Sequence, residues 1–298
     1  MLVYTIIVTY NGLKWMQRCL DSLRCSTVQS IPILIDNHST DNTIPYVKEH
    51  YPEAILLPQD KNLGFGQANN IGIRYAMEHH ADYVLLINQD ASLDPFTLER
   101  LLGQCDGESL FVPIHMNGDG TKMDYGFKNY SLLKANNEFV DDLILGQCKE
   151  KYVIGEVCAA CWLLPIKLLH RVGGFNPIFF HYGEDNNFYH RLCYHGVKTY
   201  VVPNTFMFHD RNEFGNTNAY KNKLVYRNLL LIATNINLSF SKRLVAYLRL
   251  LKECYMQGIS HKQYAPFSFL FGLIKIGVNY KQIIRGRNQE KNNNASWL

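Results

Sequence analysis

Three polar clusters follow apolar runs in the first hundred residues of this 298-residue chain. They are Thr9-Tyr10-Asn11, Asp36-Asn37 and Asn88-Gln89-Asp90. Asn and Asp often begin turns or cap helices, and that role is a sufficient explanation for any single cluster. It explains less well why the clusters end three successive runs. If the runs are parallel strands of one sheet, their carboxyl ends meet at one crevice, where such sheets bind ligands.

The runs that precede these clusters predict an α/β fold. Short β-rich segments alternate with segments of helical pattern, which indicates a mostly parallel, Rossmann-like sheet flanked by helices. Residues 103–151, rich in Gly, Asn and Asp, are expected to be irregular. We expect strands at residues 3–8, 33–36, 54–58, 83–88 and 200–208, and helices at residues 13–23, 43–50, 66–79 and 165–172.

Composition limits the class of protein. Hydrophobic residues make up 47% and charged residues 19%, so we expect disorder only near the end, at residues 288–298. The apolar first ten residues lack a basic leader and a cleavage site, which favours a buried strand over a signal peptide. No window reaches the roughly 18 apolar residues of a spanning helix. The eight cysteines are expected to be reduced thiols of a cytoplasmic protein.

Charge is divided unevenly along the chain. From Lys221 onward, 13 Lys and Arg residues stand against 2 acidic ones, a net charge of +11 that leaves −7 for residues 1–220. Apolar residues recur at helical spacing in residues 224–236 and 244–256, which predicts amphipathic helices. We therefore divide the chain into an α/β part, residues 1–214, and a basic helical extension, residues 215–298.

The basic extension has two interpretations. It either covers the acidic α/β part or lies against an anionic membrane surface. We expect no nucleic-acid partner. In the membrane interpretation, apolar side chains enter the headgroup region beside basic ones. The apolar residues are Phe267, Phe269, Leu270 and Phe271, and the basic ones are Lys242, Arg243, Arg249, Lys252, Lys275, Lys281, Arg285 and Arg287.

Several segments together resemble the family-2 glycosyltransferases, over about residues 3–212. Residues 6–11 look like the opening strand and nucleotide loop, residues 34–41 like the second strand with its base-binding aspartate, and residues 62–72 like a recurrent family segment. The resemblance implies the GT-A fold and a nucleotide-diphosphate sugar donor. It implies donor contacts from Thr9, Tyr10, Asn11, Asp36, Asn62, Gly64, Asn69 and Gln89.

Chemistry supports two of these donor contacts. An ionised Asp36 accepts hydrogen bonds only, so it can receive the N3–H of a pyrimidine base, although a helix-capping role is the alternative. The Gly64-Phe65-Gly66 turn permits close approach of a ligand ahead of a helix N-terminus, which favours negative charge. The pattern lacks the full dinucleotide-binding glycine motif, so a nicotinamide cofactor fits poorly.

The resemblance also implies a divalent metal, Mn²⁺ or Mg²⁺. Asn88-Gln89-Asp90 stands where the family usually carries Asp-x-Asp, and Asp90 supplies the carboxylate oxygen that a hard cation needs. Asn88 departs from the commoner aspartate. His209 matches a histidine that completes the metal site in many GT-A enzymes, although a structural role is the alternative. The competing interpretation of Asp90 is a turn ahead of Pro95.

A second set of residues resembles the acceptor side of rhamnosyltransferase-like members of the family. It runs from Val172-Gly173-Gly174-Phe175-Asn176 through residues 179–185 to Arg191. The resemblance implies that Asp185 is the general base, with Glu184 as runner-up or orienting partner. The alternative is an exposed helix N-terminus, where acidic residues suit the dipole. Trp162 and Tyr182 are implied acceptor contacts, Arg227 is a candidate partner of the donor diphosphate, and Asn187 departs from an aspartate common in the family.

These expectations combine into one function. We expect an inverting, metal-dependent glycosyltransferase that moves a sugar, rhamnose first, from a dTDP- or UDP-linked donor to a glycan or lipid-linked acceptor. It is expected in the cytoplasm, at the inner face of the plasma membrane, in polysaccharide biosynthesis. The alternatives are a nucleotide-sugar-binding protein without turnover, which the amides Asn88 and Asn187 support, and a sugar nucleotidyltransferase. The latter needs a glycine- and lysine-rich phosphate loop, of which residues 10–14 are a poor version.

Overall fold

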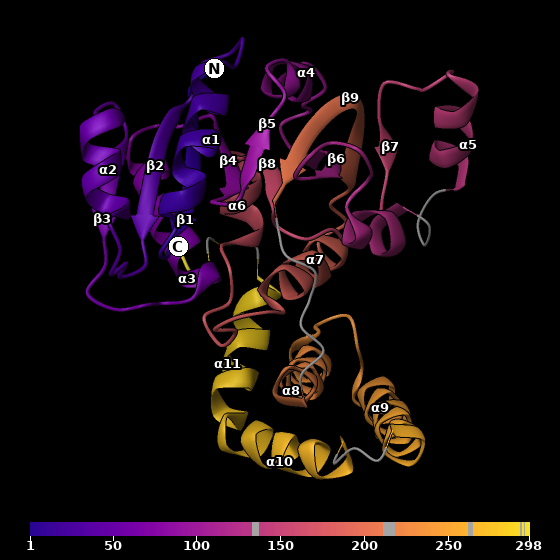
Figure 1. The fold of residues 1–298 in the computed structure, drawn as a ribbon. Helices are drawn as coiled ribbons and strands as arrows, with labels where there is room; N and C mark the ends of the chain where they lie inside the picture. Colours follow the sequence, from indigo (N-terminus) through magenta and orange to yellow (C-terminus); the bar gives the residue numbers. More distant parts are fainter. Residues whose placement is uncertain (133–136, 211–217, 262–264, 293, 295) are drawn as a thin grey trace.

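The structure, a computed structural model, describes all residues except 133–136, 211–217, 262–264, 293 and 295. The expected boundary between residues 214 and 215 therefore lies outside the described residues. An open nine-stranded sheet with helices on both faces forms the larger part of the molecule, and four C-terminal helices lie together on one side of it (Figure 1).

The sheet has a parallel half and a mixed half. Its order is β3-β2-β1-β4-β8-β6-β9-β5, and β7 pairs with β9 outside this path. The first four strands are parallel as expected, whereas β8 runs antiparallel to β4 and to β6. The strands are β1 (Val3–Thr9), β2 (Ile31–Asp36), β3 (Ile55–Pro58), β4 (Tyr83–Asn88), β5 (Ala91–Leu93), β6 (Leu110–Asn117), β7 (Tyr152–Val153), β8 (Cys161–Pro165) and β9 (Thr199–His209).

Alternating side chains of the buried strands fill two cores, one on each face of the sheet. Ile6 of β1 belongs to one cluster with Ile73 and Phe188, and its neighbour Ile7 belongs to another with Met16. The covering helices are α1 (Leu13–Arg24), α2 (Thr43–His50), α3 (Phe65–Glu78), α4 (Thr97–Gly103), α5 (Asn137–Leu145), α6 (Ile166–Val172) and α7 (Glu184–Tyr194), with a π-helical turn at Phe127–Leu132.

The segment expected to be irregular contains a central strand. Within residues 103–151, β6 pairs with β9 over seven residue pairs and carries the fully buried Phe111. A continuous apolar run, LFVPI, begins this strand, but its Pro113 argues against an interior strand. The register shift between Val112 and Ile114 resolves the conflict, because the ladder is interrupted at the proline.

The C-terminal helices form their own small cores. Val225 and Leu229 of α8 pack with Leu250 and Phe269, and a Cβ on Gly272 would lie 2.3 Å from Cδ1 of Leu229. Within the described residues, every helix is too short or too polar to cross a bilayer. The helices are α8 (Asn218–Thr234), α9 (Phe240–His261), α10 (Ala265–Val278) and α11 (Tyr280–Glu290).

The expectation of disorder at residues 288–298 is wrong for the described part of that segment. The Ser296 carbonyl accepts the Gly174 N–H at 2.8 Å, and the Trp297 carbonyl accepts from Arg74. Gly173 has φ of +77°, and a Cβ there would lie 2.2 Å from the Ser296 oxygen. The chain end therefore packs on the Gly-Gly pair, which accounts for the absence of side chains at those two positions.

Candidate active site

Hydrogen bonds join the carboxyl ends of β1, β2 and β4 into one edge. The Gln89 amide oxygen accepts from the Thr9 hydroxyl at 2.8 Å and from the Tyr10 N–H at 3.0 Å. The Asn11 N–H donates to the Ser39 hydroxyl at 2.8 Å. Tyr10 is 47% exposed, so it can contact a ligand at this edge. The predicted convergence of the three clusters is therefore present.

Asp36 lies at the end of β2 with one carboxylate oxygen in use. Its Oδ2 accepts the Ser39 N–H at 2.9 Å, while its buried Oδ1 has no hydrogen-bond partner within the part of the chain that the structure describes. The capping alternative is excluded, since α2 begins after Asn42 without any side-chain cap. A buried carboxylate oxygen without a donor costs free energy, so Oδ1 suits an N–H of a ligand.

Asn37 ties the segment after β3 to this edge. Its Oδ1 accepts the Leu63 N–H at 3.1 Å and its Nδ2 donates to the Gly64 carbonyl at 3.3 Å. The exposed Asn62 accepts the Gly64 N–H at 2.9 Å. We did not predict a role for Asn37, although its place directly after Asp36 in a strand-end cluster was a usable signal.

Asp90 and His209 meet because short β5 pairs with the end of β9. Ala91 stands opposite His209, which brings Nε2 of His209 to 3.3 Å from Oδ1 of Asp90. The Asn88 amide nitrogen lies 3.4 Å from the same Nε2, and its Oδ1 is buried without a described hydrogen-bond partner. The described residues hold no cluster of three or more His, Cys, Asp or Glu side chains suited to a metal.

These donor atoms nevertheless fit a divalent cation. A carboxylate, an imidazole nitrogen and a neutral amide oxygen are ligands that Mn²⁺ accepts, and Mg²⁺ typically uses one or two protein carboxylates together with substrate phosphates. Asp90 and His209 face one another as the resemblance implied, and Asn88 stands beside them. Phosphate oxygens of a ligand would complete the coordination.

Glu184 and Asp185 begin α7 in different environments. Glu184 is 6% exposed, and burial, with the Asp185 charge beside it, raises its pKa to about 8. Asp185 is half-buried and accepts the backbone N–H groups of Asn186 and Ala159. Burial raises the pKa of Asp185, and these hydrogen bonds oppose the rise. The exposed-terminus alternative is therefore excluded for Glu184. Because the charge of Asp185 raises the pKa of Glu184, Asp185 is the member of the pair that ionises first.

Arg227 of α8 reaches the carboxylate pair from the C-terminal helices. Its charge lowers the pKa of both Glu184 and Asp185. Gly183, with φ of +101°, lies next to Arg227, and a Cβ on Gly183 would lie 3.0 Å from Cγ of Arg227. Arg227 therefore lies beside the candidate base, and its guanidinium bonds only to the Asn228 amide within the described residues.

The glycine turn before α3 joins the two halves of the site. A Cβ on Gly64 would lie 2.0 Å from the Phe180 carbonyl oxygen, and one on Gly66 would lie 3.5 Å from Cβ of Glu184. The close approach that we expected toward a ligand is thus made by the protein's own acceptor-side segment. The predicted donor contact from Asn69 needs correction. Asn69 is 1% exposed and its amide donates to the Phe65 carbonyl, so it supports α3 and has no surface for a contact with the sugar donor.

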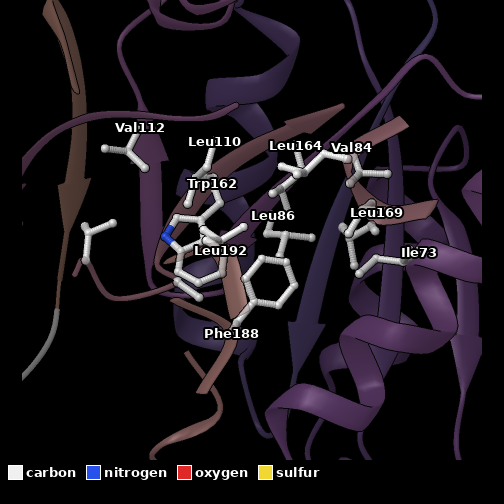
Figure 2. Packing of buried hydrophobic residues seen from close by; sticks show 14 of the residues in the cluster. Ile73, Val84, Leu86, Leu110, Val112, Trp162, Leu164, Leu169, Phe188 and Leu192 are labelled. Carbon is white, nitrogen blue, oxygen red and sulfur yellow. The ribbon is translucent and has the colours of Figure 1, made fainter. Parts of the chain in front are cut away.

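The predicted acceptor contact from Trp162 also needs correction. Its side chain is completely buried, stacked on Phe175 and tilted against Phe188 of α7, so it has no surface for an acceptor contact (Figure 2). It supports the helix that carries the carboxylates. Tyr182, by contrast, is half-buried directly ahead of Gly183 and Glu184, with φ of +68°. An acceptor contact from Tyr182 stays a prediction.

Glu290 is a residue that sequence reasoning missed. This carboxylate at the end of α11 is 1% exposed and accepts from the Asn176 amide at 2.6 Å. The fully buried Arg191 of α7 lies 3.9 Å from it and also donates to the Val172 carbonyl at 2.6 Å. The only signal was that Glu290 is one of two acidic residues after Lys221. Its ion pair with Arg191 holds α11 against α7, the helix that begins with Glu184 and Asp185.

The fold and this site define a GT-A type nucleotide-sugar transferase scaffold. The sequence model of "Glycosyl transferase family 2" matches residues 4–173, more than half of the chain, and the chain belongs to this family. It is 26% identical over 230 residues to the N-acetylglucosaminyl-diphospho-decaprenol L-rhamnosyltransferase of Mycobacterium tuberculosis, covering 69% of this chain and 75% of that protein. It is 24% identical over 218 residues to the rhamnosyltransferase WbbL of Escherichia coli K12, covering 68% and 81%.

Solved structures share the fold at lower identity. GalNAc-T7 with UDP, GalNAc and Mn²⁺ superposes with a TM-score of 0.68 at 13% identity, covering 100% of this chain and 55% of that one. TarS from S. aureus in complex with UDP superposes with a TM-score of 0.57 at 15% identity, covering 87% and 72%. The predicted GT-A fold with C-terminal helices is confirmed, and family membership argues against a sugar nucleotidyltransferase.

Proposed function

We propose that this protein is an inverting, metal-dependent glycosyltransferase that moves rhamnose from a dTDP- or UDP-linked donor to a lipid-linked glycan. The observation that carries the proposal is the unequal carboxylate pair at the start of α7. Burial and the charge of Asp185 raise the pKa of Glu184 to about 8. Burial also raises the pKa of Asp185, but its backbone donors and Arg227 oppose that rise and favour its ionised form. A carboxylate that ionises first and lies at the start of a helix is suited to accept the proton of an acceptor hydroxyl as a general base.

The reaction is a single displacement. An acceptor hydroxyl oxygen forms a bond to the anomeric carbon as the bond from that carbon to the diphosphate oxygen breaks. The hydroxyl proton passes to Asp185, and the nucleoside diphosphate leaves with the bonding electrons. One displacement inverts the anomeric configuration. Arg227 favours the ionised form of Asp185 before the proton moves.

The donor is held at the edge formed by β1, β2 and β4. Asp36 offers its unpaired Oδ1 to the base N–H, and the exposed ring of Tyr10 offers a face for stacking. Thr9 and Gln89, already bonded to one another, fix the loop at the end of β1. Asn11 and the exposed Asn62 complete the set proposed to contact the donor.

Asp90 and His209, with Asn88 beside them, would hold Mn²⁺ or Mg²⁺. When bound, such a cation neutralises charge on the diphosphate leaving group. Manganese accompanies UDP in GalNAc-T7 and GDP-Man in the mannosyltransferase PcManGT from Pyrobaculum calidifontis, two proteins that share this fold. The sugar and acceptor classes come from the two rhamnosyltransferase relatives, of which the first is named for a diphospho-decaprenol-linked acceptor. Action on such an acceptor would place the enzyme at the cytoplasmic face of the plasma membrane.

A ligand screen followed by an assay tests the proposal. Thermal unfolding with dTDP-, UDP- and GDP-sugars, each with Mn²⁺ or chelator, should give the largest rise in Tm for a dTDP- or UDP-sugar with metal. The stabilising donor is then incubated with a polyprenyl-diphosphate-linked N-acetylglucosamine. Formation of a disaccharide supports the proposal, whereas donor binding without transfer to any glycan or lipid-linked acceptor would identify a binding protein instead.

A further inference from the structure

The outer faces of α9 and α10 leave many large apolar side chains exposed. In α10, Phe267, Phe271 and Val278 are 62%, 65% and 80% exposed, while Phe269 and Gly272 on the opposite face pack against the C-terminal core. In α9 five of the exposed apolar residues recur every three or four positions and so form one stripe: Phe240, Leu244, Leu248, Leu251 and Tyr255. Soluble proteins rarely expose large apolar patches, and such patches mark protein or membrane contacts.

Basic side chains border this apolar surface. Lys242, Arg249 and Lys252 of α9 are exposed and lie three or four positions from Val245 or Met256, two further exposed apolar residues, so they share a side of the helix with them. Lys275 of α10 is exposed as well, with its ammonium 5.1 Å from the Tyr226 ring. Glu253 is the only acidic residue in the described parts of α9 and α10. An apolar face beside a basic border is the pattern of a helix that lies in an anionic bilayer interface.

The alternative in which the basic residues cover the acidic α/β part does not account for these helices. α9 and α10 pack on α8 and on one another, and α10 lies at the end of the molecule farthest from the sheet (Figure 1). Two residues of the membrane interpretation need correction. Arg287 is buried and donates to the Ala233 and Asn235 carbonyls at the end of α8, and Phe269 is buried in the core.

We propose that the outer faces of α9 and α10 bind an anionic phospholipid surface, which, on the basis of the proposed function, brings the site to a lipid-linked acceptor. Exposed Phe267, Leu270, Phe271 and Ile274 enter the headgroup region, and Lys242, Arg249 and Lys252 contact lipid phosphates. A second copy of the chain is a poorer occupant, because an isologous contact of this face would bring its basic residues together. One helix connects the two functions: α8 carries Arg227 at the carboxylate pair and Leu229 against Gly272 of α10.

Vesicle sedimentation of the full chain tests the surface. We expect binding to phosphatidylcholine vesicles that contain phosphatidylglycerol, weak binding to phosphatidylcholine alone, and loss of the preference at high salt. Phe267→Asp with Phe271→Asp should weaken binding at least about tenfold, since both rings leave the interface. Lys242→Glu with Lys252→Glu should weaken it to a similar degree and remove the anionic preference, because each basic residue is worth about fivefold near such a surface.

Matched variants elsewhere separate this surface from a general effect. Ile144→Asp with Leu145→Asp changes two equally exposed apolar residues of α5, and Lys48→Glu with Lys122→Glu changes two exposed lysines of the α/β part. Both should bind vesicles within about twofold of the unaltered protein. Hydrolysis of the donor in solution should be unchanged in all four variants, so failure of the surface and failure of the enzyme are distinguishable.

Three results would overturn the proposal. The first is that the unaltered protein shows no preference for anionic vesicles at low salt. The second is that the α9 and α10 variants bind vesicles as well as the unaltered protein. The third is that the protein self-associates and that Phe267→Asp with Phe271→Asp abolishes this self-association without changing lipid binding. Light scattering of the same samples reports the self-association. Because all substituted side chains are exposed, an unchanged Tm shows that each variant is folded.

Discussion

The donor edge, formed by the carboxyl ends of β1, β2 and β4, differs from the outer face of α9 and α10 in how its side chains are paired. At the edge, hydrogen bonds hold the polar side chains in place, as Gln89 does for Thr9 and Tyr10, and leave Oδ1 of Asp36 unpaired for a ligand. On α9 and α10, large apolar side chains remain exposed. Prearranged polar groups indicate a site that binds with little rearrangement, whereas uncovered apolar groups indicate a surface completed by something else. α7 and α8 lie between the two and carry the carboxylate pair and Arg227.

The largest expected effect is at the carboxylate pair. Asp185→Asn should lower kcat by about a thousandfold or more, because the amide keeps the shape but cannot accept the acceptor proton. The affinity for nucleotide sugar should stay near that of the unaltered protein. Transfer kinetics and calorimetry of donor binding measure the two quantities. A larger loss in Glu184→Gln than in Asp185→Asn would transfer the role of base to Glu184.

The next effect concerns the attachment of the C-terminal segment. Glu290→Ala should destabilise the protein by about 3–5 kcal/mol, since it leaves Arg191 charged, buried and without its partner carboxylate. Thermal or denaturant unfolding measures the loss. Glu253→Ala, which removes an exposed acidic residue of α9, is the control and should cost under about 0.5 kcal/mol. Equal small effects would show that the two parts are not held together by this buried pair.

The comparison also predicts that a divalent metal affects ligand binding at the donor edge alone. Removal of Mn²⁺ or Mg²⁺ by chelator should weaken binding of uridine or thymidine diphosphate at least about tenfold, because the diphosphate charge then lacks its counter-ion. Asp90→Ala should reproduce the loss in the presence of metal, and exposed Asp119→Ala should not. Calorimetry decides between these outcomes. Equal affinity in chelator would remove the metal from the mechanism.

The smallest effect at neutral pH is expected for Glu184→Gln. Glutamine resembles the protonated carboxyl, so transfer at pH 7 should stay within about fivefold of the unaltered protein. Glu184 has a pKa of about 8 in the folded protein, against an ordinary value of 4.5. Its protonated form therefore contributes its full stabilisation below pH 4.5, and this contribution is lost as the pH rises through 8. Tm of the unaltered protein should therefore fall relative to Glu184→Gln between pH 6 and pH 9. Parallel Tm curves would show that Glu184 is ionised throughout.

Sequence reasoning succeeded where local pattern determines structure. The strand at residues 83–88 and the helix at residues 43–50 were predicted at their observed bounds, since a continuous apolar run and clear end signals mark them. It failed where distant contacts decide. The interior strand β6 contains Pro113, and the ordered chain end depends on Gly173 and Gly174 more than a hundred residues earlier. Local composition indicates disorder there because it contains no information on such a partner.

The site shows the same division. Asp36, Gln89 and Asp90 were predicted as site residues because they lie at or directly after strand ends, which is a local property, and their roles stay predictions. Trp162 and Asn69 were assigned to ligands, but their burial depends on how α3 and α7 pack on the sheet. The protonation order of Glu184 and Asp185 was equally out of reach, since it follows from burial by segments distant in sequence.

The anomeric configuration of the product tests the central claim most directly. The unaltered protein is incubated with the donor that stabilises it most and with the lipid-linked acceptor, and the new linkage is examined by nuclear magnetic resonance. A single displacement assisted by Asp185 predicts inversion relative to the donor, and formation of this product at least about a thousandfold slower with Asp185→Asn. A retained configuration, or unchanged transfer by Asp185→Asn, would contradict the account.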